Sequence, residues 1–235
     1  EEARKLVDEK HGGPGCAMIA DFRALLARPD IDVAVISTPD HWHVTMAQLA
    51  LAAGKKVFCE KPTLTIEEGR RLANDVAVRK AMFAAGLEDR AVIYYHKLAE
   101  AVRNGAIGKL ERIKVSLPTK PVFAREAPVK VPDDLDYEMW LGPAPHRPYT
   151  PTLLDPQVWR QIRDFSGGSL TDWGAHLVDT AQVANFAENS SPVAVRGKGV
   201  IPPDSVNTVP RTYDITYTYA NGVELDVTAG AVSLR

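Results

Sequence analysis

Apolar and polar positions along the chain follow two different periods, and the period changes near residue 108. In the first part, stretches with helical spacing alternate with short, β-rich apolar runs that end at turn residues. This pattern predicts helices over residues 1–10, 22–27, 43–53, 65–80 and 94–104, and strands over residues 31–36, 56–59 and 81–85. Strands that alternate with helices at this rhythm indicate a parallel sheet with helices on both faces.

Local signals support several of these boundaries. Asp21 stands where the helix at 22–27 needs an N-cap, and Thr65 with Glu68 forms a capping-box pattern. Gly54 follows the helix at 43–53, as a C-terminal glycine does. The run at 31–36 is nearly all apolar, which is typical of a strand buried on both faces.

From residue 110, apolar and polar positions alternate, which is typical of strands with one solvent-exposed face. Strands are predicted over residues 110–115, 193–200, 212–219 and 223–229, and Asn221-Gly222 joins the last two as a hairpin. Between them lie a proline-rich passage at 118–156, with one short helix at 137–141, and a helix at 175–186. We therefore place a domain boundary near Gly108, and we expect an α+β domain with an open, mainly antiparallel sheet over residues 109–235.

Composition narrows the classes of function. The 235 residues are 45% hydrophobic and 25% charged, with a formal net charge of -2, and this gives no reason to expect a nucleic-acid or membrane partner. The two cysteines, Cys16 and Cys59, form neither a CxxC pair nor a disulfide framework. This usage fits the cytoplasm, although an exported protein without disulfides would have the same composition.

Both ends of the sequence resemble the interior of a larger protein. The chain starts at Glu1 within a helical pattern, without an initiator Met, a signal peptide or an opening strand. No GxGxxG turn occurs, because Gly13-Pro14-Gly15 fails the spacing and its proline has no N–H to donate, so a helix-terminating loop is favoured there. At the other end, Ser233-Leu234-Arg235 falls inside the expected sheet domain. We expect a fragment that lacks a first βαβ unit.

Two polar motifs follow predicted strands. The strand at 31–36 is followed by Ser37-Thr38-Pro39-Asp40-His41-Trp42-His43, and the strand at 56–59 is followed by Glu60-Lys61-Pro62. Because ligands of open α/β sheets bind at the carboxyl ends of the strands, both motifs are expected to line one crevice. The plain alternatives are a charged turn at residues 60–62 and a surface pair of histidines, and a metal site at this HxH pair would need additional ligands.

A third cluster lies at residues 167–176, in the second domain. Asp172 and His176 are four residues apart, so on a helix they share a face, and a carboxylate with an imidazole can move a proton near neutral pH. Nearby Trp159 offers a stacking platform, while Arg160 and Arg163 offer contacts to hydroxyl or carboxylate groups. The structural alternatives are a helix N-cap for Asp172 and a buried core position for His176.

Taken together, these motifs resemble one family. STPDHWH at 37–43, CEKP at 59–62, GAIGKL at 105–110 and GGSLTDWGAH at 167–176 occur in the order and spacing of the Gfo/Idh/MocA oxidoreductases. The resemblance implies an incomplete Rossmann-type domain over residues 1–108, followed by a C-terminal substrate domain over 109–235. It also implies NAD or NADP as cofactor and a small carbohydrate as substrate, with an oligomer formed through the C-terminal sheet. Because the phosphate-binding turn is missing, we expect this chain alone to bind the cofactor weakly or not at all.

The resemblance also assigns roles to individual residues. Lys61 is expected beside the nicotinamide and the substrate. Asp172 and His176 are expected to bind sugar hydroxyls and to transfer a proton, with Asp172 orienting His176 or a neighbouring hydroxyl. Trp159, Arg160 and Arg163 are the remaining substrate candidates. The expected cofactor contacts are Ser37, Thr38, Pro39, His41, Trp42, Glu60, Lys61 and Pro62.

The expected reaction is oxidation of a CH–OH group. NAD(P)⁺ takes a hydride from a sugar carbon while His176, or Lys61 with it, removes the hydroxyl proton. Three alternatives stay open. An NAD-dependent glycosidase of the same family would oxidise its sugar only transiently. A non-catalytic remnant would keep the fold without the cofactor. A metal hydrolase would use His41, His43, Asp172 and His176, without any HExxH pattern to support it.

Overall fold

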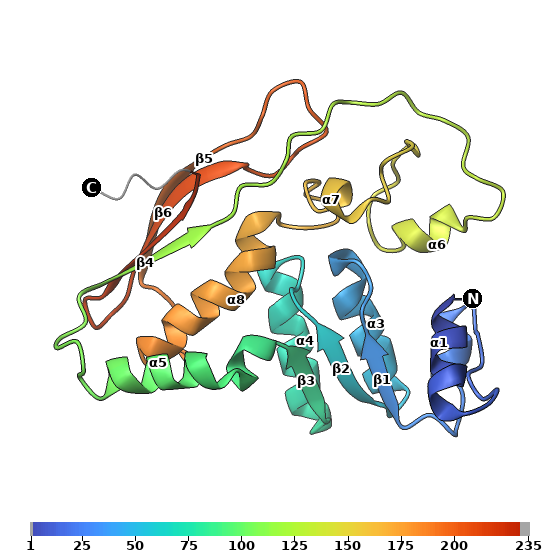
Figure 1. The fold of residues 1–235 in the computed structure, drawn as a ribbon, viewed down its shortest axis with the longest axis horizontal. Coiled ribbons are helices and arrows are strands. Elements are labelled where there is room, and N and C mark those ends of the chain that lie inside the picture. The colour runs from blue at the N-terminus through green and yellow to red at the C-terminus, as the bar shows by residue number, and fades with distance from the viewer. Residues whose placement is uncertain (1, 231–235) are drawn as a thin grey trace.

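The computed structural model describes residues 2–230, which form two β-sheets with a long helix between them (Figure 1). The predicted fold class is confirmed, because a three-stranded parallel sheet comes first and a four-stranded mixed sheet follows. The predictions made for Glu1 and for Ser233-Leu234-Arg235 lie outside the described residues. No helix within residues 2–230 has the length and apolar character to cross a membrane.

The first sheet has the strand order β1-β2-β3, with all strands parallel. Its strands are β1 (Val33–Ile36), β2 (Lys56–Glu60) and β3 (Phe83–Gly86). The helices of this part are α1 (Glu2–His11), α2 (Phe22–Leu26), α3 (Asp40–Ala52), α4 (Ile66–Arg79) and α5 (Ile93–Arg103), with a 3₁₀ turn, η1 (Glu88–Ala91), before α5. The predicted caps are present: Asp21 accepts a hydrogen bond from the N–H of Arg23, and Thr65 and Glu68 form a capping box.

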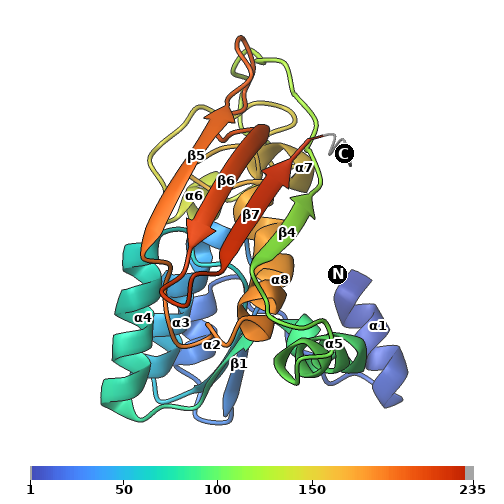
Figure 2. The same cartoon turned by 90° about the vertical axis from the view of Figure 1, so that its left-hand side faces the viewer.

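One face of the first sheet is buried, and the prediction that residues 31–36 are buried on both faces is wrong. Burial alternates along β1, so Ala34 and Ile36 enter the core, whereas Val33 and Val35 are 50% and 68% exposed. Helices α3 and α4 cover the buried face, and α1 and α5 lie on the other side of the sheet (Figure 2). These two helices leave Val33 and Val35 exposed. Within the described residues, only alternate positions of the apolar run at 31–36 are therefore buried.

The second sheet has the order β4-β7-β6-β5. Its strands are β4 (Arg112–Leu117), β5 (Ala194–Val200), β6 (Thr212–Thr218) and β7 (Glu224–Ala229). β5, β6 and β7 are antiparallel neighbours, as expected for a strand followed by a hairpin, but β4 pairs with β7 in parallel. The inner face of the sheet packs against a long helix, α8 (Ser169–Ala184), through Leu117, Leu225 and Val227.

Helix α8 begins six residues before its predicted start at 175. Gly168, with φ of 68°, is its N-cap, and Gly174 lies inside it. Packing on the second sheet compensates for the low helix propensity of a glycine, which local pattern alone does not reveal. The cluster at 167–176 is therefore mostly the first two turns of a helix.

The proline-rich passage folds around a small core of its own. It contains the predicted short helix α6 (Tyr137–Leu141), and a further turn of helix, α7 (Pro156–Trp159), begins at its end. Leu141, Ile162 and Phe165 are buried in this core. This region packs over the carboxyl end of the first sheet and completes the second domain (Figure 1).

Candidate active site

The carboxyl ends of β1 and β2 meet the first turns of α8, and this junction gathers the motifs from both domains. The two strands are parallel neighbours, so the segments that follow them, residues 37–39 and 61–62, leave the sheet at one edge. α8 crosses this edge from the second domain (Figure 1). Lys61 and Asp172, which are 111 positions apart in sequence, make contact there.

Lys61 is joined to Asp172 by two hydrogen bonds. Its Nζ donates to Asp172 Oδ1 at 2.8 Å and to the Asp172 carbonyl oxygen at 3.1 Å. The two side chains are 15% and 18% exposed, so the contact is largely shielded from water. Asp172 is not the N-cap of α8, because Gly168 holds that position. The carboxylate therefore bonds across the domain junction and not to the start of its own helix.

A second ammonium group, which the sequence reasoning missed, reaches the same carboxylate. Lys120 Nζ lies 3.2 Å from Asp172 Oδ2 and 5.8 Å from the centre of the Trp173 ring. Burial raises the pKa of Asp172, but hydrogen bonds and charges from Lys61 and Lys120 outweigh this effect and hold the pKa below its usual value. Asp172 is thus ionised at neutral pH. Lys120 lies in the proline-rich passage, where no motif marks it.

His176 faces a different carboxylate from the expected one. Its Nδ1 lies 3.2 Å from Asp89 Oδ2 and 3.7 Å from Glu88 Oε1, and both acids belong to η1. Lysines contact both oxygens of Asp172, and Asp89 is the carboxylate next to the imidazole. Of the two roles expected for Asp172, orientation of His176 is therefore not seen, and orientation of a substrate hydroxyl stays a prediction. The side chain of His176 is 14% exposed, so it is largely shielded from water at the junction.

The start of α3 binds the second domain. His41 Nε2 lies 2.9 Å from the carbonyl oxygen of Trp140, and Trp42 Nε1 donates to the carbonyl oxygen of Met139 at 3.0 Å. Gly142, which ends α6 with φ of 50°, admits the Trp42 ring, because a Cβ there would lie 2.1 Å from it. The structure places these two ring systems at the domain interface, and their expected contact with a cofactor stays a prediction.

Trp159 is part of the small core of the second domain. It is 5% exposed and packs with Leu153 and Phe165, so the expected stacking platform for a substrate is not formed by this ring. The Arg160 guanidinium lies over Trp159 at 4.3 Å from its ring centre. Arg163 instead lines a cavity of about 700 Å³ between the start of α4 and the second domain.

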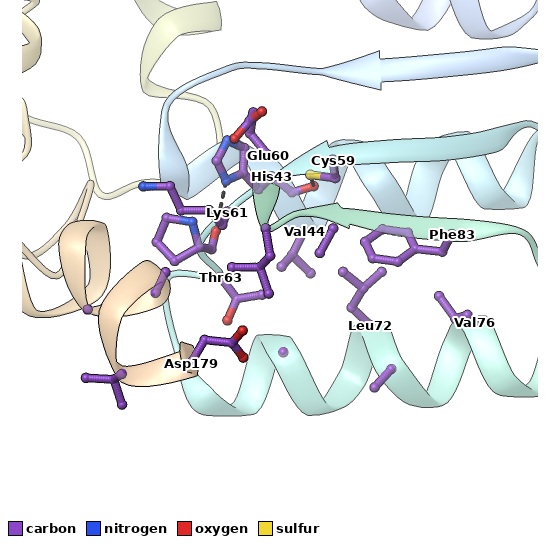
Figure 3. A pocket seen from close by; sticks show the side chains of 18 of the residues that line it. His43, Val44, Cys59, Glu60, Lys61, Thr63, Leu72, Val76, Phe83 and Asp179 are labelled. Carbon is purple, nitrogen blue, oxygen red and sulfur yellow. Dashed lines mark hydrogen bonds between the residues drawn. The ribbon is translucent and has the colours of Figure 1, made fainter. Parts of the chain in front are cut away.

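Another cavity, of about 650 Å³, lies beside Lys61 between β2, β3, α4 and α8 (Figure 3). Its walls are mostly apolar and include Leu72, Val76 and Phe83. Figure 3 shows the Lys61 side chain pointing away from these apolar residues. Lys61 lines this cavity but Asp172 does not. The cavity is therefore separate from the contact between Lys61 and Asp172, and Lys61 lies at the border between them.

Metal-ligand geometry is absent from the described residues. Within residues 2–230, no group of three or more His, Cys, Asp or Glu side chains is arranged to hold a metal ion. The rings of His41 and His43 lie against backbone carbonyl oxygens instead.

Two models of a single family match the chain. Residues 2–87 match the NAD-binding Rossmann fold of the Gfo/Idh/MocA oxidoreductases, and residues 122–232 match the C-terminal alpha/beta domain of the same family. The chain belongs to the Gfo/Idh/MocA family. The predicted family and fold are thereby confirmed, and the expected nicotinamide cofactor agrees with the NAD-binding type of the first domain.

Relatives within the family include sugar and polyol enzymes. The inositol 2-dehydrogenase of Rhizobium meliloti is 32% identical over 106 residues, which are 45% of this chain and 32% of that protein. The 1,5-anhydro-D-fructose reductase of Ensifer adhaerens is 28% identical over 178 residues, 74% of this chain and 43% of that protein. An NAD-binding protein from Listeria innocua shares the fold, with a TM-score of 0.68 and 21% identity over 100% of this chain and 56% of its own. In all three matches the aligned part is less than two thirds of the relative.

The strand ends fit the nicotinamide end of such a cofactor. Thr38 Oγ1 is buried and lacks a hydrogen-bond partner among the described residues, which leaves an unused donor and acceptor at the end of β1. Lys61 adds an ammonium group at the end of β2. Among the described residues, Gly13-Pro14-Gly15 does not form a cradle for the diphosphate of the cofactor, since this segment follows a helix, is exposed and has open space at both glycines.

Proposed function

We propose that this chain carries catalytic residues of an NAD(P)-dependent oxidoreductase that acts on a CH–OH group of a sugar or polyol. The observation that carries the proposal is the contact between Lys61 and Asp172, which joins the NAD-binding domain to α8 at the strand ends. Membership of the family and the named dehydrogenase and reductase relatives support an oxidoreductase. Ammonium and carboxylate groups side by side suit a substrate with several hydroxyl groups.

In the proposed oxidation each residue of the site has its own role. When bound, NAD(P)⁺ supplies the acceptor for a hydride. Lys61 binds the reacting hydroxyl oxygen, and Asp172, kept ionised by Lys61 and Lys120, accepts hydrogen bonds from neighbouring hydroxyls. His176 takes the hydroxyl proton on its imidazole, and Asp89 stabilises the cation that results.

Replacing the ammonium group of Lys61 tests the proposal. NADH or NADPH formation is followed with the intact protein and a panel of sugars and polyols, and we expect Lys61→Met to lower turnover about 10²–10⁴-fold. Lys130→Met is the matched control, because the Lys130 side chain is 81% exposed and pairs only with Asp133, a surface residue three positions away. Equal turnover of Lys61→Met and the control variant would reject the assignment of Lys61.

The same assay separates the alternatives. Release of free sugar from a glycoside without net NADH would mean a glycosidase. Calorimetry that detects no binding of NAD or NADP by the intact protein, as distinct from residues 1–235 alone, together with no turnover of any sugar, would favour a non-catalytic protein and would contradict the proposal.

A further inference from the structure

The two histidines of the HxH pair occupy different environments, although both belong to the first turn of α3 and both are 2% exposed. His41 uses one ring nitrogen, because Nε2 meets the carbonyl oxygen of Trp140 and Nδ1 has no hydrogen-bond partner among the described residues. Burial lowers the pKa of His41, which favours a neutral ring. A neutral imidazole needs only one acceptor, and His41 has one.

His43 uses both ring nitrogens. Its Nδ1 lies 2.8 Å from the carbonyl oxygen of Pro62, and its Nε2 lies 2.8 Å from the carbonyl oxygen of Thr38. In Figure 3 a dashed line marks the hydrogen bond between the His43 ring and the carbonyl oxygen of the residue after Lys61. A carbonyl oxygen can only accept a hydrogen bond, so each of these contacts needs an N–H group on the ring. A neutral imidazole carries one N–H group, and its second nitrogen would place a lone pair against an oxygen lone pair.

We propose that His43 carries a proton on both ring nitrogens and acts as a positioning residue, a clamp between the segments that follow β1 and β2. Thr38 belongs to the first segment and Pro62 to the second, directly after Lys61. Cys59 Sγ donates to the carbonyl oxygen of His43 at 3.7 Å, so β2 also contacts the backbone of the clamp. The His43 ring thus fixes the position of the backbone segment from which Lys61 reaches Asp172.

The surroundings supply a counter-charge for a doubly protonated ring. Asp40 lies one turn before His43 on α3 and is 4% exposed. Burial raises the pKa of Asp40 above its usual value, and a hydrogen bond from Ser166 and the charges of His43 and Arg160 offset only part of this rise. An imidazolium beside this carboxylate offsets part of the cost of burying both groups.

The first test is spectroscopic and needs neither a substrate nor a variant. Two-bond proton–nitrogen correlation spectra of the ¹⁵N-histidine-labelled protein at neutral pH report each ring nitrogen separately. We expect two protonated-type nitrogen resonances for His43, and one protonated-type and one unprotonated-type resonance for His41. An unprotonated-type nitrogen in His43 would overturn the proposal.

The second test measures how firmly the clamp holds β2. Cys59 is 3% exposed and burial raises its pKa to about 12, so a thiol reagent reaches it only when this region opens. We expect His43→Gln, which keeps one donor group, to speed labelling of Cys59 by about tenfold, a change that corresponds to about 1.4 kcal/mol. His41→Gln is the matched control, since it alters an equally buried ring that bonds to α6.

The outcomes of these tests are distinct. An unchanged labelling rate in His43→Gln, or an equal increase in His41→Gln, would contradict the clamp. The value of the clamp for catalysis rests on the proposed function. If the spectrum shows a doubly protonated His43 in a protein without NAD(P)-dependent turnover, the proposed function fails while the clamp stands.

Discussion

At the scale of single residues, the site depends on one carboxylate shared by two lysines. Asp172 accepts from Lys61 and lies beside Lys120, and all three side chains are mostly shielded from water. Removing any one of them would change the charge balance of the other two. Lys120 and Lys61 therefore share one carboxylate partner, although the two lysines come from different domains.

Asp172→Asn tests this arrangement through its dependence on pH. The folded protein holds the pKa of Asp172 below its usual value, so the stabilising effect is complete above the unfolded-state pKa of about 4 and is lost as pH falls through the lowered, folded-state pKa. We expect the variant to be about 1–3 kcal/mol less stable than the wild type at neutral pH. Urea unfolding at neutral and strongly acidic pH measures this gap. A gap that stays constant into strong acid would contradict the ion-pair explanation.

At the scale of elements, burial of the first sheet is one-sided. Leu72 on α4 is 6% exposed and belongs to the core between sheet and helices, whereas Val35 on β1 points to the open side and is 68% exposed. The two residues are both apolar, and their local sequences do not show this difference. Contacts with α3 and α4 decide which face is covered.

A pair of alanine substitutions measures this asymmetry. Leu72→Ala should cost about 2–5 kcal/mol, because it removes buried atoms and leaves a cavity, while Val35→Ala should stay within about 0.5 kcal/mol. Chemical denaturation of the two variants gives the comparison. Similar costs for both substitutions would mean that the open face is covered in solution.

At the scale of the whole molecule, the start of α3 joins the two domains. Ser166 Oγ, in the segment before α8, donates to Asp40 Oδ2 at 2.6 Å, and both residues are buried. Trp42 adds a bond to α6 from the same turn of helix. The Lys61–Asp172 contact is therefore formed only when the domains are held in this arrangement.

Ser166→Ala removes the hydroxyl donor from a buried carboxylate. We expect a loss of about 1–3 kcal/mol and a broader calorimetric unfolding transition, because the coupling between the domains becomes weaker. Ser190→Ala is the control, since Ser190 is exposed and bonds only within its own turn. A transition as sharp as that of the control would show that Asp40 does not couple the domains.

Neighbouring residues were sufficient to predict the family, the order of most helices and strands, and the three motifs that meet at the junction. These features are local: strand and helix periods, caps such as Thr65 with Glu68, and short motifs can be read from neighbouring residues. The same reading gave Lys61 and Asp172, because each belongs to a motif.

The residues that these motifs contact depend on how distant parts of the chain pack together. Lys120 and Asp89 have no local signature, and they reach the site because a proline-rich loop and a 3₁₀ turn pass beside α8. The same packing places Asp172 between two lysines, buries Trp159 and moves the start of α8 to Ser169. Such contacts join positions that are far apart in the chain, 111 residues in the case of Lys61 and Asp172, and no local pattern encodes them.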